Sequence, residues 1–199
     1  RYWVPFDLQV NPRVALTSLE ITDDQWTAAA NGAPDLSLER YRNLHTLLNR
    51  TAKSNPKPDY VILPELAIPR RWVQSMVKKL LDRGISLIAG VEYRDDPYNS
   101  GLVHNEALIA LRSNYPGYLT NFVVFQPKEA PAWKELADLD TKHGKRFAAP
   151  STGSPDRPVY VHDGFCFGVL ICSELSDIKN RLRFQGKVDA LFVPEWNPD

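Results

Sequence analysis

The sequence predicts a layered α/β fold in which helices cover sheets of buried strands. Continuous apolar runs at 60–63, 85–91 and 165–171 are rich in β-branched and aromatic residues, as strands buried on both faces are. Before and between the first two runs, apolar residues recur at helical spacing. This alternation of strand and helix predicts right-handed crossovers within one layered domain.

The composition is that of an ordinary globular protein and excludes several classes of function. The chain has 199 residues, of which 43% are hydrophobic and 24% charged, enough for one domain with a sizeable core. Basic and acidic residues number 24 each, so no excess charge favours nucleic acid or an anionic membrane. No apolar run approaches the roughly 20 residues of a membrane span, and we expect no signal peptide.

The two cysteines, Cys166 and Cys172, predict a reduced, cytoplasmic protein. Six residues of strand span about 20 Å, whereas a disulfide needs Cα atoms within about 7 Å, so the two should not pair. Without a third cysteine the chain has no disulfide framework. The histidines are scattered singly without zinc spacing, and we therefore expect no metal site.

The N-terminal half predicts the order β-α-β-α-β. Residues 1–12 form an irregular lead-in, and the domain occupies 13–199. A first strand at 13–21 is followed by a loop at 22–36, which carries turn signals. The next elements are a helix at 36–53 with Ser37 as N-cap, the strand 60–63, a helix from Pro69 to Gly84, and the strand 85–91.

The C-terminal half predicts two hairpins separated by a long loop. Strands at 102–111 and 120–125 enclose the turn signal Pro116-Gly117. Residues 129–158 are rich in charge, Pro and Gly, with a short helix at 132–139, and are expected to act as a lid. Strands at 159–162 and 164–171, a helix, and a last strand at 188–193 complete the pattern.

The last hairpin ends abruptly on Cys172. After the apolar run the chain becomes polar at Cys172, Ser173 and Glu174, and a helical pattern follows. Strand, sharp turn and helix around one thiol is the geometry of a nucleophile elbow. A helix N-terminus and a nearby cation both favour the thiolate. A lone free cysteine, however, is more often a small buried hydrophobe than a nucleophile.

Reactive side chains follow three separate apolar strands: Glu65, Lys128 and Cys172. Ligands of open α/β sheets sit beyond the carboxyl ends of strands, so we expect the three to converge. Cys172 would attack a carbon bonded to nitrogen, Glu65 would transfer protons, and Lys128 with the backbone N–H of Ser173 would stabilise the developing negative charge. Taken singly, Glu65 is explained by helix capping and Lys128 by a surface pair with Glu129.

Five features, in order along the chain, resemble the nitrilase (carbon–nitrogen hydrolase) superfamily. They are Val61-Ile-Leu-Pro-Glu65-Leu, Asn105 on the strand before the lysine, Lys128 itself, Gly168-Val-Leu-Ile-Cys172-Ser-Glu174, and Asp189-Ala-Leu-Phe-Val-Pro194. The resemblance covers nearly the whole chain.

The resemblance implies a four-layer α-β-β-α sandwich with a Glu-Lys-Cys triad and neither metal nor organic cofactor. The family's closing strands and helix have no counterpart before Asp199, so we expect a sandwich that lacks its last elements. It also implies a homo-oligomer, frequently a dimer. A second glutamate follows the lysine in many members, and Glu135 is the best match, with Glu129 the weaker candidate.

The function predicted first is a hydrolase of a small-molecule amide, carbamoyl compound or nitrile. The alternative is a nitrilase-like module that binds a ligand or mediates assembly within a longer protein, for example one fused to a reverse transcriptase in phage defence. A third interpretation is an α/β domain in which the triad is coincidental. We expect neither a membrane nor a nucleic-acid partner.

The predicted pocket walls come from three loops, 22–36, 93–101 and 129–158. The candidate pocket residues are Tyr93, Asn105, Trp133, Glu174 and Trp196. Aromatic residues at such positions also occur at protein interfaces, and substrate choice depends on loop shape rather than on the fold.

Overall fold

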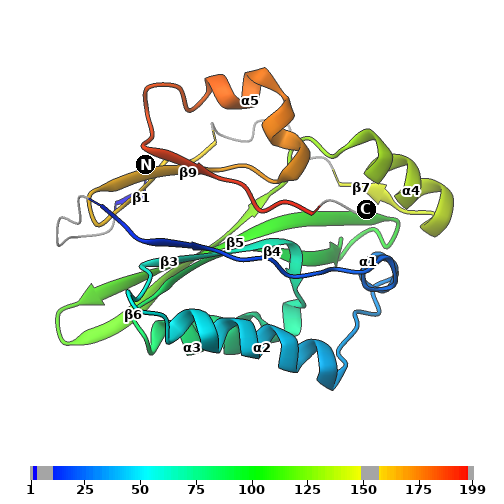
Figure 1. The fold of residues 1–199 in the computed structure, drawn as a ribbon. Coiled ribbons are helices and arrows are strands. Elements are labelled where there is room, and N and C mark those ends of the chain that lie inside the picture. The colour runs from blue at the N-terminus through cyan, green and yellow to red at the C-terminus, as the bar shows by residue number, and fades with distance from the viewer. Residues whose placement is uncertain (1, 4–10, 149–156, 197–199) are drawn as a thin grey trace.

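The computed structural model describes residues 2–3, 11–148 and 157–196, which form four layers (Figure 1). Helices α2 (Leu38–Ala52) and α3 (Val73–Leu81) form one outer layer, and α5 (Ile178–Leu182) forms the other. Two sheets lie between them. This is the α-β-β-α sandwich that the resemblance implies.

The larger sheet has six strands. In sequence order they are β2 (Val14–Leu16), β3 (Tyr60–Ile68), β4 (Ser86–Asp95), β5 (Leu102–Tyr115), β6 (Tyr118–Pro127) and β7 (Arg146–Phe147). The first five lie side by side in that order, and β7 pairs with β5. Strands β2, β3 and β4 are parallel, as the predicted crossovers require, and β5 and β6 form the predicted hairpin.

The smaller sheet has four strands in the order β1-β8-β9-β10. They are β1 (Tyr2–Trp3), β8 (Tyr160–His162), β9 (Phe165–Val169) and β10 (Ala190–Phe192). The predicted hairpin is present as the antiparallel pair β8 and β9, and β10 runs parallel to β9. Strand β1 comes from the predicted lead-in and adds to this sheet beside β8.

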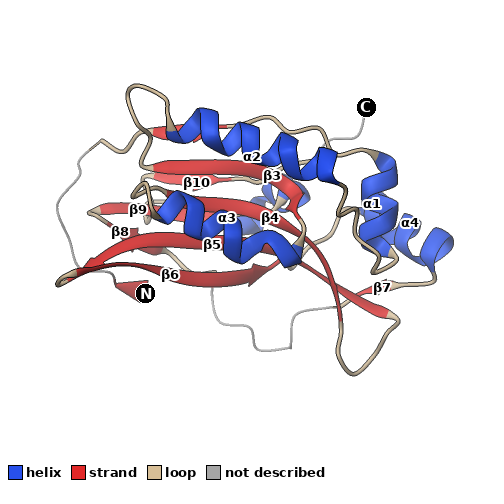
Figure 2. Cartoon of the chain, turned by 90° about the horizontal axis from the view of Figure 1, so that it is seen from below, coloured by secondary structure: helices blue, strands red, loops and turns tan. Residues whose placement is uncertain are grey.

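Helices α2 and α3 cover the outer face of the larger sheet (Figure 2). Ser37 caps α2 as predicted, because its side chain accepts a hydrogen bond from Arg40 N at 3.2 Å. A 3₁₀ turn (Arg70–Trp72) precedes α3, and Gly84 with φ of +65° follows it. The remaining elements are α1 (Asp23–Ala30), α4 (Trp133–His143) and the 3₁₀ helix Cys172–Ser176.

The prediction of a loop throughout 22–36 is wrong, because residues Asp23–Ala30 form α1. Thr22 and Gln25 make a reciprocal capping box: Gln25 N donates to Thr22 Oγ1 at 3.2 Å, and Thr22 N donates to Gln25 Oε1 at 3.3 Å. In the predicted loop 129–158, α4 extends to His143 and β7 follows. Residues 149–156 of that loop lie outside the described part of the chain.

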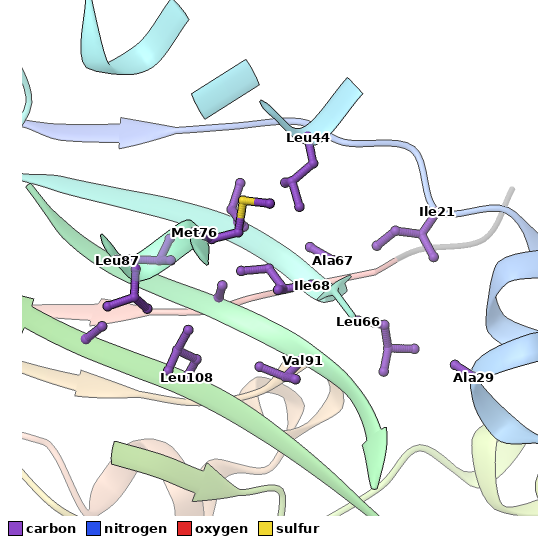
Figure 3. Packing of buried hydrophobic residues seen from close by; sticks show 14 of the residues in the cluster. Ile21, Ala29, Leu44, Leu66, Ala67, Ile68, Met76, Leu87, Val91 and Leu108 are labelled. Carbon is purple, nitrogen blue, oxygen red and sulfur yellow. The ribbon is translucent and has the colours of Figure 1, made fainter. Parts of the chain in front are cut away.

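Two hydrophobic cores share β3. Leu44 and Met76 from the helices pack against Ala67 and Ile68 of β3, in the core between the helices and the larger sheet (Figure 3). The second core lies between the sheets and contains Tyr60, Ile62, Ile88, Ile109, Phe167, Val169 and Phe192, among others. From Tyr60 to Leu63, successive side chains of β3 therefore enter opposite cores, which explains why this part of the strand is a continuous apolar run.

Candidate active site

The structure brings Glu65, Lys128, Cys172 and Glu135 to one cavity of about 390 Å³. Lys128 Nζ donates to Glu65 Oε1 at 2.8 Å and to Glu135 Oε2 at 2.6 Å. The other lining residues are Asp23, Trp26, Thr27, Leu66, Ala132, Lys134, Asp138, Lys142 and Trp196. Three chain segments far apart in sequence thus place their reactive groups together, although the catalytic role of each stays a prediction.

Glu65 lies within β3 at an irregularity, and not beyond the strand end as predicted. The pairing of β3 with β4 shifts between Leu63 and Ile68, and Leu66 has a left-handed φ of +59°. Arg40 Nη2 donates to Leu66 O at 3.3 Å and helps hold this conformation, which few non-glycine residues adopt. The shift gives Glu65 its place in the cavity lining.

Gly90 of β4 permits this irregularity. A Cβ atom on Gly90 would lie 2.2 Å from Glu65 Cα and 2.5 Å from Leu66 N, both of them backbone atoms. No side chain fits there without moving the backbone that carries Glu65. The position of the carboxylate therefore depends on a glycine in the neighbouring strand.

Lys128 follows β6 directly, as predicted, and its side chain is 1% exposed. Burial alone would lower the pKa of Lys128, but Glu65 and Glu135 outweigh this and raise it, so the lysine is a cation. Burial raises the pKa of Glu65; Lys128 opposes that shift and Glu135 adds to it. A carboxylate of raised basicity next to a fixed cation suits proton transfer near neutral pH.

Asn105 and Tyr93 orient the two carboxylates. Asn105 Nδ2 donates to Glu65 Oε1 at 2.7 Å and to Glu135 Oε1 at 3.1 Å. Tyr93 Oη donates to Glu135 Oε1 at 2.7 Å and accepts from Trp26 Nε1 at 3.2 Å. Burial and the adjacent Glu135 raise the pKa of Tyr93, which keeps its proton for this bond. Neither residue lines the cavity, whereas the sequence predicts both as pocket residues.

Cys172 occupies the sharp turn that the sequence predicts. Its φ of +46° is left-handed, which is unusual for a residue with a side chain and is typical of a nucleophile elbow. The 3₁₀ helix Cys172–Ser176 and α5 follow it. Cys172 N donates to Pro194 O at 3.0 Å, and Sγ donates to Trp196 O at 3.7 Å, so the segment after β10 holds the turn.

The prediction that the surroundings favour a thiolate is wrong for this resting state. Burial raises the pKa of Cys172 to about 12; Glu65 adds to the rise, and Lys128 opposes it. Desolvation therefore outweighs the cation, and the thiol is protonated at neutral pH. A protonated thiol needs a base at the moment of attack, and Glu65 lines the same cavity.

Alkylation of Cys172 by iodoacetamide should therefore accelerate about tenfold per pH unit from about pH 7 to about pH 10, without a plateau, because only the thiolate reacts. The rate is measured by intact-mass spectrometry in a Cys166→Ala background, so that one thiol reports. A short cysteine peptide serves as control and should level off near pH 8.5, its roughly ordinary pKa. A plateau for Cys172 below about pH 9 would contradict the protonated resting thiol.

The remaining predicted residues divide into two groups. Trp196 lines the cavity, and its ring lies 6.3 Å from that of Trp26 at an interplanar angle of 19°. Trp133 does not line it and is 83% exposed, because it begins α4 on the solvent side. Glu174 also lies outside the lining and is fully buried. The N–H of Ser173 as an oxyanion donor stays a prediction; its Oγ donates to Ala130 O at 2.9 Å.

Two of the three predicted loops contribute to the cavity. Segment 22–36 contributes through α1, and 129–158 contributes through Ala132 and α4, whereas no lining residue comes from 93–101. Trp26 is not among the pocket residues that the sequence predicts, although the Thr-x-x-Gln pattern of the capping box is a signal for the helix that carries it. Glu129, the weaker candidate for the second glutamate, pairs with Arg157 and Arg183 instead.

In the described part of the chain, no three or more His, Cys, Asp or Glu side chains are grouped so that they could hold a metal ion. None of the described helices combines the length and apolar character of a membrane span.

No family model and no curated protein sequence matches this chain. Solved structures match in fold. An amidase from Nesterenkonia sp. has a TM-score of 0.56 at 17% identity, covering 92% of this chain and 64% of the amidase. A second structure of that enzyme, NitN amidase, has a TM-score of 0.57 at 16% identity, covering 93% and 67%. The glutamine-dependent NAD⁺ synthetase from Acinetobacter baumannii has a TM-score of 0.54 at 18% identity, covering 80% and 30%.

These likenesses define the class of fold. Another structure of the Nesterenkonia amidase is described as a member of the nitrilase superfamily, and the present chain has that fold. The resemblance first seen in the sequence motifs is thus shown at the level of architecture. The chain spans about 30% of the NAD⁺ synthetase and 64% of the amidase.

Proposed function

We propose that the chain is a thiol hydrolase of carbon–nitrogen bonds other than peptide bonds. The observation that carries the proposal is the buried Lys128, held between Glu65 and Glu135 in the cavity that Cys172 also lines. The fold neighbours support it. In one structure of the Nesterenkonia amidase, the acetamide moiety of fluoroacetamide is covalently added at the active-site cysteine.

The first half-reaction forms a thioester. Cys172 Sγ attacks the amide carbonyl carbon while Glu65 accepts the thiol proton. The developing oxyanion is stabilised by the Lys128 cation, with the N–H of Ser173 as a second donor. The carbon–nitrogen bond then breaks, and Glu65 returns the proton to the leaving nitrogen, so that ammonia or an amine departs and the acyl group remains on sulfur.

The second half-reaction releases the acyl group. Glu65 takes a proton from water, the resulting hydroxide attacks the thioester carbonyl, and the same cation stabilises the second oxyanion. The carbon–sulfur bond breaks, the thiolate recovers its proton from Glu65, and a carboxylic acid leaves. A nitrile would follow the same course through a thioimidate, with one further water consumed.

The size of the cavity favours a small substrate. Its volume of about 390 Å³ is within the range for small-molecule sites and far below what a folded protein needs. Trp26 and Trp196 supply an apolar wall beside the triad. We therefore propose amides, carbamoyl compounds and nitriles of a few carbon atoms as the substrate class.

Ammonia release tests the proposal directly. The protein is incubated with a panel of small amides, carbamoyl compounds and nitriles, and ammonia is measured. Cys172→Ala should lower the rate on any substrate by at least about 1,000-fold, because the nucleophile is gone. The matched control Cys166→Ala should retain the wild-type rate, since Cys166 does not line the cavity. Equal rates for both variants, or no ammonia from any compound, would reject the proposal.

A second function deserves a test because the Cys172 thiol is protonated and bonded to Trp196 O in the resting structure. In this alternative the chain is a ligand-binding or assembly module of a longer protein, with little or no turnover. Thermal-shift binding of the same panel, together with sedimentation for self-association, distinguishes the two functions. A compound that stabilises wild type and Cys172→Ala equally, without ammonia release, favours the module.

A further inference from the structure

A second buried ionic cluster lies beside the candidate site and takes no part in the proposed reaction. Glu174 is completely buried, and the Arg157 side chain is 1% exposed. The Arg157 guanidinium pairs with the Glu174 carboxylate, and its Nη1 also donates to Pro127 O at 2.9 Å. Neither residue lines the cavity.

The Glu174 carboxylate joins the two segments that carry the nucleophile and the cation. On the nucleophile side it accepts from Ile171 N at 2.8 Å, the residue before Cys172. On the lysine side it accepts from Glu129 N at 2.5 Å and from Ala130 N at 3.3 Å. Segments 127–130 and 171–174 are thus tied to each other through one side chain.

Two further contacts reinforce this link. Ser173 Oγ donates to Ala130 O at 2.9 Å, directly between the same two segments. Asn180 of α5 donates to Glu174 O at 3.2 Å and fixes the backbone of the turn. Burial raises the pKa of Glu174, and Arg157 is the largest opposing influence, so the arginine supports the charged carboxylate that accepts these bonds.

We propose that Glu174 and Arg157 are positioning residues that set the placement of the Lys128 cation relative to the Cys172 sulfur. This inference rests on the proposed function, since that placement matters only if the two groups act on one substrate. Neither residue touches the reacting atoms. Displacement of such a group by about 1 Å can cost about 100-fold in rate, so a link this short has a measurable effect.

The test uses four variants of the whole chain. Glu174→Gln and Arg157→Met each remove one charge at nearly constant volume, and the double variant removes both. Arg183→Gln is the matched control, because Arg183 pairs with Glu129 from the solvent side and is 41% exposed. For each we measure Tm, kcat and KM on the best amide, and the rate of Cys172 alkylation at fixed pH.

The single variants should lose Tm, because Arg157→Met leaves the buried Glu174 carboxylate without an opposite charge, and Glu174→Gln leaves the buried Arg157 with Glu129 alone. Their kcat should fall about 100-fold with KM nearly unchanged. The double variant should recover Tm but not kcat, because no carboxylate remains to accept the three backbone N–H groups. Cys172 alkylation should slow by about tenfold in all three, since the Lys128 cation that lowers the pKa of the thiol is displaced. Arg183→Gln should match wild type throughout.

If kcat and alkylation recover together with Tm in the double variant, the cluster is only structural and the inference is rejected. If either single variant fails to fold, the double variant still decides. If wild type releases no ammonia, the proposed function fails, but alkylation still tests the link: slower reaction in the double variant supports it, and an unchanged rate rejects it.

Discussion

Replacement of Lys128 by Met should give a protein that is inactive and also about 3–5 kcal/mol less stable at neutral pH. The lysine is the cation between Glu65 and Glu135, and its loss leaves two carboxylates close together without compensation. Urea unfolding at pH 7 measures the stability, and ammonia release measures the activity. Few single substitutions both abolish activity and lower the stability by this much.

The control for this variant is Lys78→Met, an exposed lysine of α3 that should change stability by less than about 0.5 kcal/mol. The deficit of Lys128→Met should shrink as the pH falls towards about 4, because protonation of the carboxylates removes their repulsion. A variant as stable as wild type at pH 7 would contradict the buried ionic cluster described above.

Glu65→Gln should lower kcat by about 10²–10⁴-fold, the usual contribution of a positioned general base. Asn105 and Lys128 can still donate to the amide oxygen, so KM should change little. The acid limb of the pH–rate profile should disappear with the titrating group. A variant with the wild-type profile would show that another residue accepts the thiol proton.

Unlike Lys128→Met, Glu65→Gln should become more stable than wild type as the pH rises. The folded-state pKa of Glu65 is raised, so the folded state binds this proton more tightly than the unfolded state does. The stability that Glu65 contributes is therefore complete below about pH 4.3 and is lost as the pH rises through its folded-state value. Relative to wild type, Glu65→Gln should gain stability over that range. The exposed Glu39→Gln is the control.

The sequence predicts that Glu65, Lys128 and Cys172 lie close together because each of them follows an apolar run. Such runs locate strands buried on both faces, and polar residues at their ends are conspicuous. These three residues can therefore be identified from the sequence, and in the structure all of them line one cavity. Asn105 and Tyr93, which orient the carboxylates of Glu65 and Glu135, lie on β5 and β4, and their hydrogen bonds form only after the sheet has assembled.

Features that depend on a neighbouring strand could not be predicted. The sequence predicts a strand at 60–63, yet β3 continues to Ile68 because Gly90 leaves room for a shifted pairing. The sequence predicts a thiolate at Cys172 where burial keeps a thiol, for a similar reason: a cation can be anticipated from the sequence, but the extent of burial cannot. The pairing of Arg157 with Glu174 could not be predicted either, because Arg157 lies outside the described strands and helices and no local pattern relates it to Glu174.

The irregularity at Glu65 has a consequence for how the central sheet folds. Apolar residues on both faces of β3 would tolerate a slip of one residue against β4, since hydrophobic alternation specifies alignment only where one face is polar. In a slipped sheet, Ala89 or Val91 would take the place of Gly90, and its Cβ would meet the backbone of Glu65. The geometry that places the Glu65 carboxylate in the cavity therefore also excludes misaligned sheets. The position of Glu65 and the alignment of β3 with β4 depend on the same glycine.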